Sequence, residues 1–186
     1  MLQRDGGAMS LRELSAAAGV GTPTLKHYFG ARQDIVDAIF EESLRLGRQG
    51  LDAQSRSDKP FASSVHDYAS ALVFALDNER DPRLGDLFAV SLAEGLLDAR
   101  ISTSTIKHIV DPTLEALVER LTLHMQRGEM IQTDARAAAL MLLSPILLAC
   151  LHQNQLHGAQ DRPIGLEALA ETVGAAFVRA FATSHG

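Results

Sequence analysis

Six prolines constrain the fold of this chain most strongly, because proline is tolerated in the first turn of an α-helix but disrupts the interior of a helix or a sheet. Most of them stand where a run of apolar residues with helical spacing begins. They are Pro23, Pro60, Pro82, Pro112, Pro145 and Pro163. The 186 residues include 27 alanines and 27 leucines, which favour helix over strand. We therefore predict an all-α protein of about eight helices.

The cysteine and apolar content exclude several classes of protein. Cys150 is the single cysteine of the sequence, so an internal disulfide and a disulfide-stapled secreted scaffold are excluded. The first ten residues lack the apolar core of a secretory signal. The longest apolar stretch, 137–151, is shorter than the roughly 20 residues of a membrane-spanning helix. We therefore expect a cytoplasmic protein with no membrane partner.

The spacing of apolar residues predicts where the helices lie. Two short helices are expected over 10–19 and 22–29, and a longer one over 32–46 is expected to end at Gly47 and Gly50. The remaining helices are predicted over 61–76, from Asp81-Pro82 to about 97, over 103–125 with a kink at 108–111, from Thr133 or Asp134 to 151 with a bend at Pro145, and over 165–182.

Residues 10–29 carry the strongest functional signal in the sequence. Ser10 and Glu13 have the spacing of a capping box, a turn with two glycines follows at 19–21, and Gly30 ends the second predicted helix. This pattern predicts a helix-turn-helix, in which the first helix crosses the DNA backbone and the first turn of the second enters the major groove. Ordinary helical packing, with no special role for the exposed residues, is the alternative interpretation.

The charge distribution is compatible with DNA at one end of the chain. The net charge is −6, but residues 1–33 hold four basic and two acidic side chains, a local charge of +2. The remaining residues hold 13 basic and 21 acidic side chains, a charge of −8. A mildly basic start on an acidic body fits a molecule with one end facing phosphate.

The helix-turn-helix residues resemble those of a known family. Residues 10–20 read Ser-Leu-Arg-Glu-Leu-Ser-Ala-Ala-Ala-Gly-Val, residues 24–30 read Thr-Leu-Lys-His-Tyr-Phe-Gly, and a predicted helix then opens near Arg32 with Asp34-Ile35. They are similar to the DNA-binding domain of the tetracycline-repressor (TetR) family of bacterial regulators. The close similarity covers roughly residues 9–40. The rest matches as architecture, including a last pair of helices that looks like the family's dimerising pair and contains the run 142–148.

This resemblance implies the domain organisation and the DNA-contacting residues. Residues 1–46 would form the helix-turn-helix module, with the family's first helix truncated to its last turn. Residues 47–186 would form a helical ligand-binding and dimerisation domain. The implied DNA-binding residues are Thr22, Pro23 and Thr24 in the groove-facing first turn, Lys26, His27 and Tyr28 on bases or phosphates, and Arg32, which stands where the family usually has a phosphate-binding lysine. Gly21 and Lys26 depart from the family's usual residues at these positions.

The function implied is ligand-responsive transcriptional repression. A homodimer would bind operator DNA, and a small hydrophobic or amphipathic molecule would release it. The alternative is a dimeric ligand-binding or protein-interaction module that has lost DNA binding with its first helix, and an enzyme is a third possibility. Candidate ligand contacts are Tyr68, Ser91, Glu94, His108, His124 and Ser144. The alternative for each is an ordinary residue on an exposed face, or a core residue whose hydrogen bonds are satisfied within the protein. Candidate dimer contacts are Leu147, Leu151, Phe177 and Phe181.

No cofactor or metal site is predicted. The histidines share no metal-ligand spacing, and the glycines at 19 and 21 lack the third glycine and preceding strand of a dinucleotide-binding loop. Cys150 lies in an apolar run, which indicates a buried, inert thiol.

Overall fold

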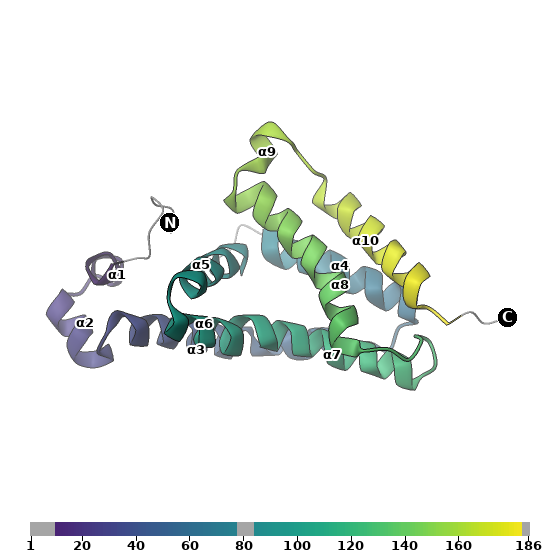
Figure 1. The fold of residues 1–186 in the computed structure, drawn as a ribbon, viewed down its shortest axis with the longest axis horizontal. Helices are drawn as coiled ribbons and strands as arrows, with labels where there is room; N and C mark the ends of the chain where they lie inside the picture. Colours follow the sequence, from purple (N-terminus) through teal and green to yellow (C-terminus); the bar gives the residue numbers. More distant parts are fainter. Residues whose placement is uncertain (1–9, 78–83, 184–186) are drawn as a thin grey trace. The chain divides into compact units, whose positions relative to one another are not determined.

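The computed structural model describes residues 10–77 and 84–183, and it confirms the all-α expectation. The helices along the chain are α1 (Leu11–Ala18), α2 (Thr22–Phe29), α3 (Arg32–Gln54), α4 (Phe61–Asp77), α5 (Leu84–Leu97), α6 (Ala99–Thr105), α7 (Asp111–Gln126), α8 (Ala135–Cys150), α9 (Gly158–Asp161) and α10 (Leu166–Phe181), with π-helical segments at Ile106–Val110 and Leu151–Gln155 (Figure 1). An isolated bridge between Met130 and Ala182 is the β-type pairing found within the described ranges.

The chain forms two compact units. The first contains the described residues of Met1–Arg48 together with Val90–Asp111, and the second contains those of Gln49–Ala89 and Pro112–Gly186. The boundary near residue 48 lies close to the one that the sequence suggests. Residues 90–111 group with the N-terminal helices, however, whereas the sequence pattern alone places them in the body.

Helices α1 and α2 form as the sequence predicts. Ser10 caps α1 through a capping box, in which the Ser10 backbone N–H donates to Glu13 Oε2 at 2.8 Å and the Glu13 N–H donates to Ser10 Oγ at 3.3 Å. Gly19 ends α1 in the left-handed conformation, with φ of 67°. Leu14, Leu25 and Ile35 form the small apolar core that joins α1, α2 and α3, with Leu11 packed against it.

Helix α3 is longer than predicted, since it continues through Gly47 and Gly50 to Gln54. Each glycine in a helix interior costs only about 1 kcal/mol relative to alanine, which packing further along the helix can offset. The end of α3 is held by Arg120, whose Nε donates to the Gln54 carbonyl at 2.6 Å. The glycine-based end of this helix was therefore a wrong prediction.

The predicted irregularity near residues 108–111 is confirmed as the π-helical segment Ile106–Val110, which ends two residues before Pro112. Proline has no backbone N–H to donate within the helix, which accounts for a local change in hydrogen bonding at this point. Helix α6 starts earlier than expected because Asp98 caps it, accepting from the N–H groups of Arg100 and Ile101. The predicted start at Asp81-Pro82 lies outside the described residues.

The second unit has its core where α4, α8 and α10 pack together. Asp134 caps α8, as one of the two predicted alternatives, and Pro145 lies inside the helix. With the following π-helical segment, this helix runs from Ala135 to Gln155 and is long and apolar enough to cross a membrane by length and composition. The estimate that it is too short was therefore wrong. In this structure the helix packs on α4 and α10.

Candidate nucleic-acid interface

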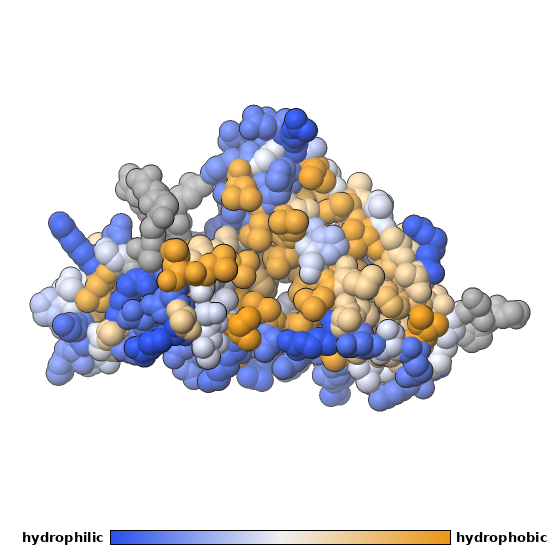
Figure 2. All heavy atoms as spheres, viewed as in Figure 1, coloured by the Kyte–Doolittle hydropathy of each residue, from blue (hydrophilic) through white to orange (hydrophobic). Residues whose placement is uncertain are grey.

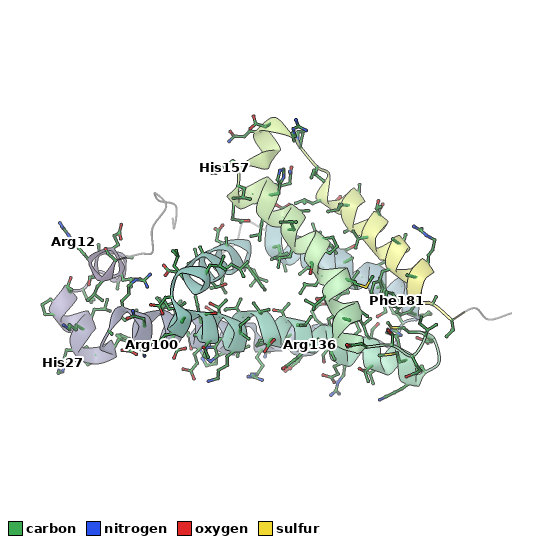
Figure 3. The ribbon with its side chains drawn as sticks, in the orientation of Figure 1. Arg12, His27, Arg100, Arg136, His157 and Phe181 are labelled. Atoms are coloured by element: carbon green, nitrogen blue, oxygen red, sulfur yellow. The ribbon has the colours of Figure 1, made fainter. Side chains whose placement is uncertain are left out.

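Helix α2 exposes most of the side chains that the sequence assigns to DNA. Leu25 is its one buried residue, at 6% exposure. Thr22 is half-buried, while Pro23, Thr24, Lys26, His27 and Tyr28 are exposed, Tyr28 by 77%. Figure 3 shows His27 on the outside of this helix. Small, polar and basic side chains therefore lie on the open surface of α2, as a recognition helix requires.

The turn after α2 fixes the direction in which this helix points. Gly30 ends α2 with φ of 85°, a conformation that L side chains rarely adopt, and its N–H donates to the Lys26 carbonyl at 2.9 Å. Asp34 then accepts from the Ala31 N–H at 2.8 Å. A side chain at position 30 would also meet the Asp34 carboxylate. The predicted stop at Gly30 is thus a specific backbone requirement.

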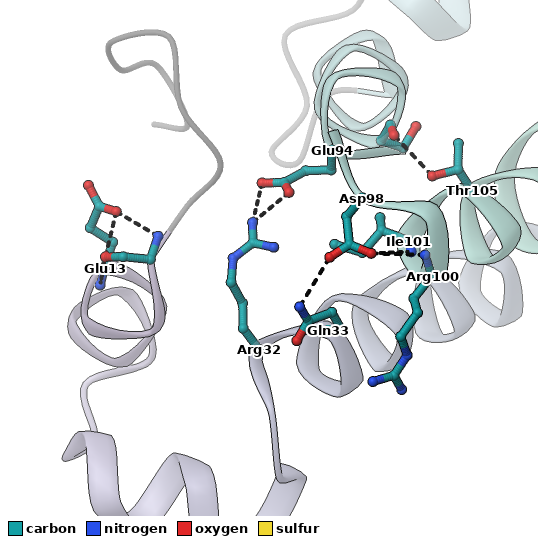
Figure 4. A network of polar contacts seen from close by, with 10 residues as sticks. Glu13, Arg32, Gln33, Glu94, Asp98, Arg100, Ile101 and Thr105 are labelled. Carbon is teal, nitrogen blue, oxygen red and sulfur yellow. Dashed lines mark hydrogen bonds and ion pairs between the residues drawn. The ribbon is translucent and has the colours of Figure 1, made fainter. Parts of the chain in front are cut away.

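The side chain of Arg32 is bound to Glu94 within the first compact unit. Its Nη2 donates to both carboxylate oxygens of Glu94 on α5, at 2.5 Å each, and the two side chains are 17% and 7% exposed (Figure 4). The guanidinium that the resemblance assigns to a DNA phosphate is therefore bound to a carboxylate. Sequence reasoning gave no signal for this pair, because the two residues are 62 positions apart.

Further polar contacts join the start of α3 to the segment around α6. We call this set of contacts, including Arg32–Glu94, the α3 ladder. Its other members are Gln33 Nε2 to Asp98 Oδ2 at 3.1 Å, Arg100 Nη2 to Asp34 Oδ1 at 3.1 Å, and Ser104 Oγ to Asp37 Oδ1. The ladder explains why residues 90–111 group with the N-terminal helices.

A cleft of about 210 Å³ lies beside the ladder. It is lined by Gln33, Asp34, Asp37, Arg100, Ile101, Thr103, Ser104 and Lys107. The lining is polar or charged apart from Ile101, unlike the mostly apolar cavity expected for a hydrophobic ligand. None of the six ligand candidates from the sequence lines this cleft, and several of its charged groups already pair with one another.

The six ligand candidates are divided between the two units. In the first unit, Glu94 pairs with Arg32, the Ser91 carbonyl accepts from Thr105 Oγ1 at 3.0 Å, and His108 Nδ1 lies 3.1 Å from Ser104 Oγ. In the second unit, Tyr68 and His124 are buried, whereas Ser144 is exposed on α8. A ligand role for any of them stays a prediction.

Tyr68 and His124 border a buried polar network. His124 Nε2 lies 2.8 Å from Ser64 Oγ and His124 Nδ1 lies 2.5 Å from Glu129 Oε2. Arg120 Nη1 donates to the same serine oxygen at 3.0 Å, and its guanidinium lies over the Tyr68 ring at 5.7 Å. Burial raises the pKa of Tyr68 and lowers that of Arg120. If Nδ1 carries the hydrogen and donates to Glu129, Nε2 accepts from the Ser64 hydroxyl, and the serine oxygen accepts from Arg120.

Ser64, His124 and Glu129 are linked by contacts in the order found in a hydrolytic serine–histidine–acid triad. Ser64 and His124 are both 0% exposed, however, so no substrate can reach the hydroxyl in this structure. The serine oxygen is also occupied by the arginine that donates to it. The network is a hydrogen-bonded core element, since a nucleophile needs access to its substrate as well as a base.

The predicted dimer contacts are only partly on the surface. Phe177 is 5% exposed and packs against Phe61 and Phe181, with ring centroids 6.2 and 4.6 Å away, so its own protomer covers most of its side chain and a dimer contact there stays a prediction. Leu147, Leu151 and Phe181 are half-buried. The apolar residues that α8 does expose are Leu140, Met141 and Leu148, at 44, 60 and 65%. Figure 2 shows hydrophobic residues gathered over α8 and α10.

Cys150 is buried, as predicted from its apolar neighbours, and burial raises the pKa of its thiol to about 11. No group of three or more His, Cys, Asp or Glu side chains suited to a metal occurs in the part of the chain that the structure describes.

The overall fold matches that of solved bacterial regulators. No protein-family model and no curated protein matches the sequence. A regulator assigned to the TetR family from Mesorhizobium loti superimposes with a TM-score of 0.74 at 16% identity, over 94% of this chain and 87% of that one. A TetR regulator from Agrobacterium tumefaciens (TM-score 0.60, 16% identity, 95% and 86%) and the TetR-family regulator PfmR from Thermus thermophilus (0.60, 20%, 92% and 88%) also match. The chain therefore has the fold of TetR-family transcriptional regulators over nearly its whole length.

Proposed function

We propose that this chain is a transcriptional regulator that binds operator DNA through α2. The observation that carries the proposal is the exposed row of small, polar and basic side chains on α2, anchored by the buried Leu25, in a chain with the TetR fold. Thr22, Pro23 and Thr24 would face the major groove. Lys26, His27 and Tyr28 would contact bases or phosphates.

The active form would be a homodimer. Leu140, Met141 and Leu148 on α8 leave an apolar surface that a second copy would cover. A two-fold axis through this surface would repeat α2 in both protomers. Paired recognition helices about 34–36 Å apart read two half-sites one turn of DNA apart.

A small molecule would control this activity and make the protein a repressor in the cytoplasm. Only a ligand with different affinities for the DNA-binding and released states can shift the equilibrium between them. The second unit, which contains α4, α8 and α10, is the proposed ligand-binding part, in keeping with the helical body that the TetR resemblance assigns to ligands. The protein would act by binding rather than by catalysis.

The test is to select duplexes from a random pool with the full chain and to measure affinity against salt. Lys26→Ala is expected to weaken binding to all duplexes and to lower the slope of log K against log salt by about 1. Arg136→Ala removes the same charge from an exposed position on α8 and is expected to leave both values unchanged. A wild-type protein without salt-dependent binding to any duplex would rule out the proposed function.

The second candidate function is a dimeric ligand-binding module without DNA binding. The Arg32–Glu94 pair and the net charge of −6 favour it. Dimerisation and ligand stabilisation without affinity for duplex DNA would support this candidate over a repressor.

A further inference from the structure

We propose that Glu94 is an internal competitor of DNA, which holds Arg32 away from phosphate in the structure described here. This inference rests on the proposed function and concerns its regulation. Arg32 is the first residue of α3 and follows the recognition helix after a two-residue turn. Its guanidinium is nevertheless bound to both oxygens of the Glu94 carboxylate, at 2.5 Å.

The competition follows from the chemistry of the guanidinium. In the structure the Arg32 Nη2 donates to both Glu94 oxygens, so the charge of the guanidinium is already balanced by a carboxylate. Carboxylate and phosphate both bind arginine strongly, so a phosphate has to compete with Glu94 for the same guanidinium. The pair is also largely shielded from solvent, with side-chain exposures of 17% and 7%, so salt screens it less than an exposed pair. Arg32 therefore exchanges one anion for another when DNA binds.

The small number of positive charges near α2 makes the partner of Arg32 important for DNA affinity. Within residues 10–33 the cations are Arg12, Lys26 and Arg32, and Glu13 is the one acid. Binding of Arg32 to Glu94 cancels one of these three positive charges. The electrostatic part of DNA affinity scales with the number of phosphates that cations neutralise. Release of Arg32 would thus add a full phosphate contact to a small set.

The neighbouring contacts let Arg32 leave without dissolving the unit. Gln33 and Asp98 hold α3 next to α6 independently of Arg32. The backbone next to Glu94 packs closely on α6, because a Cβ at Gly95 would come within 2.8 Å of Thr105 Oγ1 and the same hydroxyl donates to the Ser91 carbonyl. Of the two side chains, Arg32 is the more exposed, at 17% against 7% for Glu94.

The experiment compares Glu94→Gln with Glu42→Gln in the full chain. Glu42 forms an exposed pair with Arg45 on α3, so its substitution makes the same change in net charge without releasing Arg32. Each protein is titrated with a mixed-sequence duplex of about 30 base pairs, long enough for two half-sites, by fluorescence anisotropy at several salt concentrations. Arg32→Gln and the double variant Arg32→Gln, Glu94→Gln complete a double-mutant cycle.

Glu94→Gln is expected to bind more tightly than wild type and to lose about three- to fourfold more affinity between 50 and 200 mM salt, the effect of one added phosphate contact. Glu42→Gln is expected to keep the wild-type salt dependence. In the Arg32→Gln background, Glu94→Gln is expected to give no gain. Wild-type salt dependence in Glu94→Gln, or an equal gain without Arg32, overturns the competition while leaving the proposed function in place.

Melting curves identify variants that do not fold. If Glu94→Gln is unfolded, Glu94→Asp shortens the carboxylate by one methylene, and a folded Glu94→Asp is expected to show part of the same gain. A folded Glu94→Asp with wild-type affinity and salt dependence overturns the competition. If neither wild type nor any variant binds DNA in a salt-dependent way, the proposed function fails and the competition fails with it.

Discussion

Leu25 is the residue that connects the recognition surface to the core. It is 6% exposed and packs with Leu14 and Ile35, while its neighbours on α2 face solvent. Leu25→Ala is expected to reduce the free energy of unfolding by about 2–3 kcal/mol, because it leaves a cavity in a small core. Urea unfolding followed by circular dichroism measures this loss. Tyr28→Ala, at a position 77% exposed, is the control, and equal urea midpoints for the two variants would contradict the packing role.

Cys150 is expected to react very slowly with Ellman's reagent in the folded protein at pH 8 and rapidly in urea. Burial raises the pKa of the thiol to about 11, so few molecules carry the reactive thiolate at pH 8. Because the folded state favours the protonated thiol, this contribution to stability is complete below about pH 8.5 and is lost as the pH rises toward 11. Rapid modification without denaturant would show that the thiol is accessible.

Single residues were predictable from sequence where the signal was local. The capping box at Ser10, the stop at Gly30 and the exposed positions of α2 all depend on neighbours within a few residues. The Arg32–Glu94 pair depends on tertiary structure, and its partners give no pattern in the sequence. Phe177 has the spacing of an apolar face, and the sequence could not show that its ring is buried within its own protomer while the rest of that face is half-buried.

At the scale of elements, α6 depends on its N-cap. Asp98 accepts from Gln33 and from two backbone N–H groups, and the Gln33 hydrogen bond, followed by that from the Arg100 backbone, holds the pKa of Asp98 below its usual range. The ionised form therefore stabilises the folded state at pH values above about 4, and this stabilisation is lost as the pH falls further. Asp98→Ala is expected to lower the melting temperature by about 2–4 °C at pH 7.

The same variant has a second readout in its pH dependence. The difference in melting temperature between wild type and Asp98→Ala is expected to narrow in acid, since the protonated carboxyl is a weaker acceptor. Scanning calorimetry of both proteins between pH 3 and neutral pH (roughly the range of carboxylate titration) measures this difference in melting temperature. A difference that stays constant over this range would mean that the charge of Asp98 does not contribute.

Gly47→Ala and Gly50→Ala are each expected to stabilise the protein by about 0.5–1 kcal/mol. Both glycines lie inside α3, both are exposed, and a Cβ at either position would have no atom within 4 Å. Alanine favours the helix over glycine and reduces the freedom of the unfolded chain. Urea midpoints measure the gain. Gly30→Ala is the contrasting control, since its positive φ and the nearby Asp34 carboxylate predict a loss.

The position of most helices was predictable from sequence, but their exact ends were less so. Caps at Ser10, Asp134 and Gly165 are encoded by adjacent residues, and the structure has helices starting there. The end of α3 is not encoded by adjacent residues, because its last turn is held by Arg120, which lies far away in the sequence. The short α9 and the π-helical segment Leu151–Gln155 left no periodic signal long enough to detect.

At the scale of the whole molecule, charge is divided unevenly along the sequence. The N-terminal 33 residues carry +2 and the remainder carries −8, so an acidic body accompanies a mildly basic N-terminal segment. If the chain binds DNA as proposed, the acidic body is expected to repel DNA away from α2 and so to limit non-specific binding. The division into a DNA-binding module over 1–46 and a body over 47–186 stays a prediction. The grouping of 90–111 with the N-terminal helices could not be predicted, because the α3 ladder joins residues more than 60 positions apart.

Dimerisation is the property of the whole molecule that the exposed face of α8 predicts. Leu148→Glu is expected to convert the wild-type dimer into a folded monomer, because it places a charge in an apolar surface that a second copy would cover while leaving the protomer core intact. Sedimentation velocity at micromolar concentration separates the two forms. Leu96→Glu, at a position on α5 that is 87% exposed, is expected to remain dimeric. Phe177→Glu is unsuitable as a test because the buried ring supports the protomer core, so a loss of dimer in that variant would follow from unfolding.

A monomeric wild-type protein, or a dimeric Leu148→Glu variant, would place the interface elsewhere. Either result would remove the basis for pairing two recognition helices through α8.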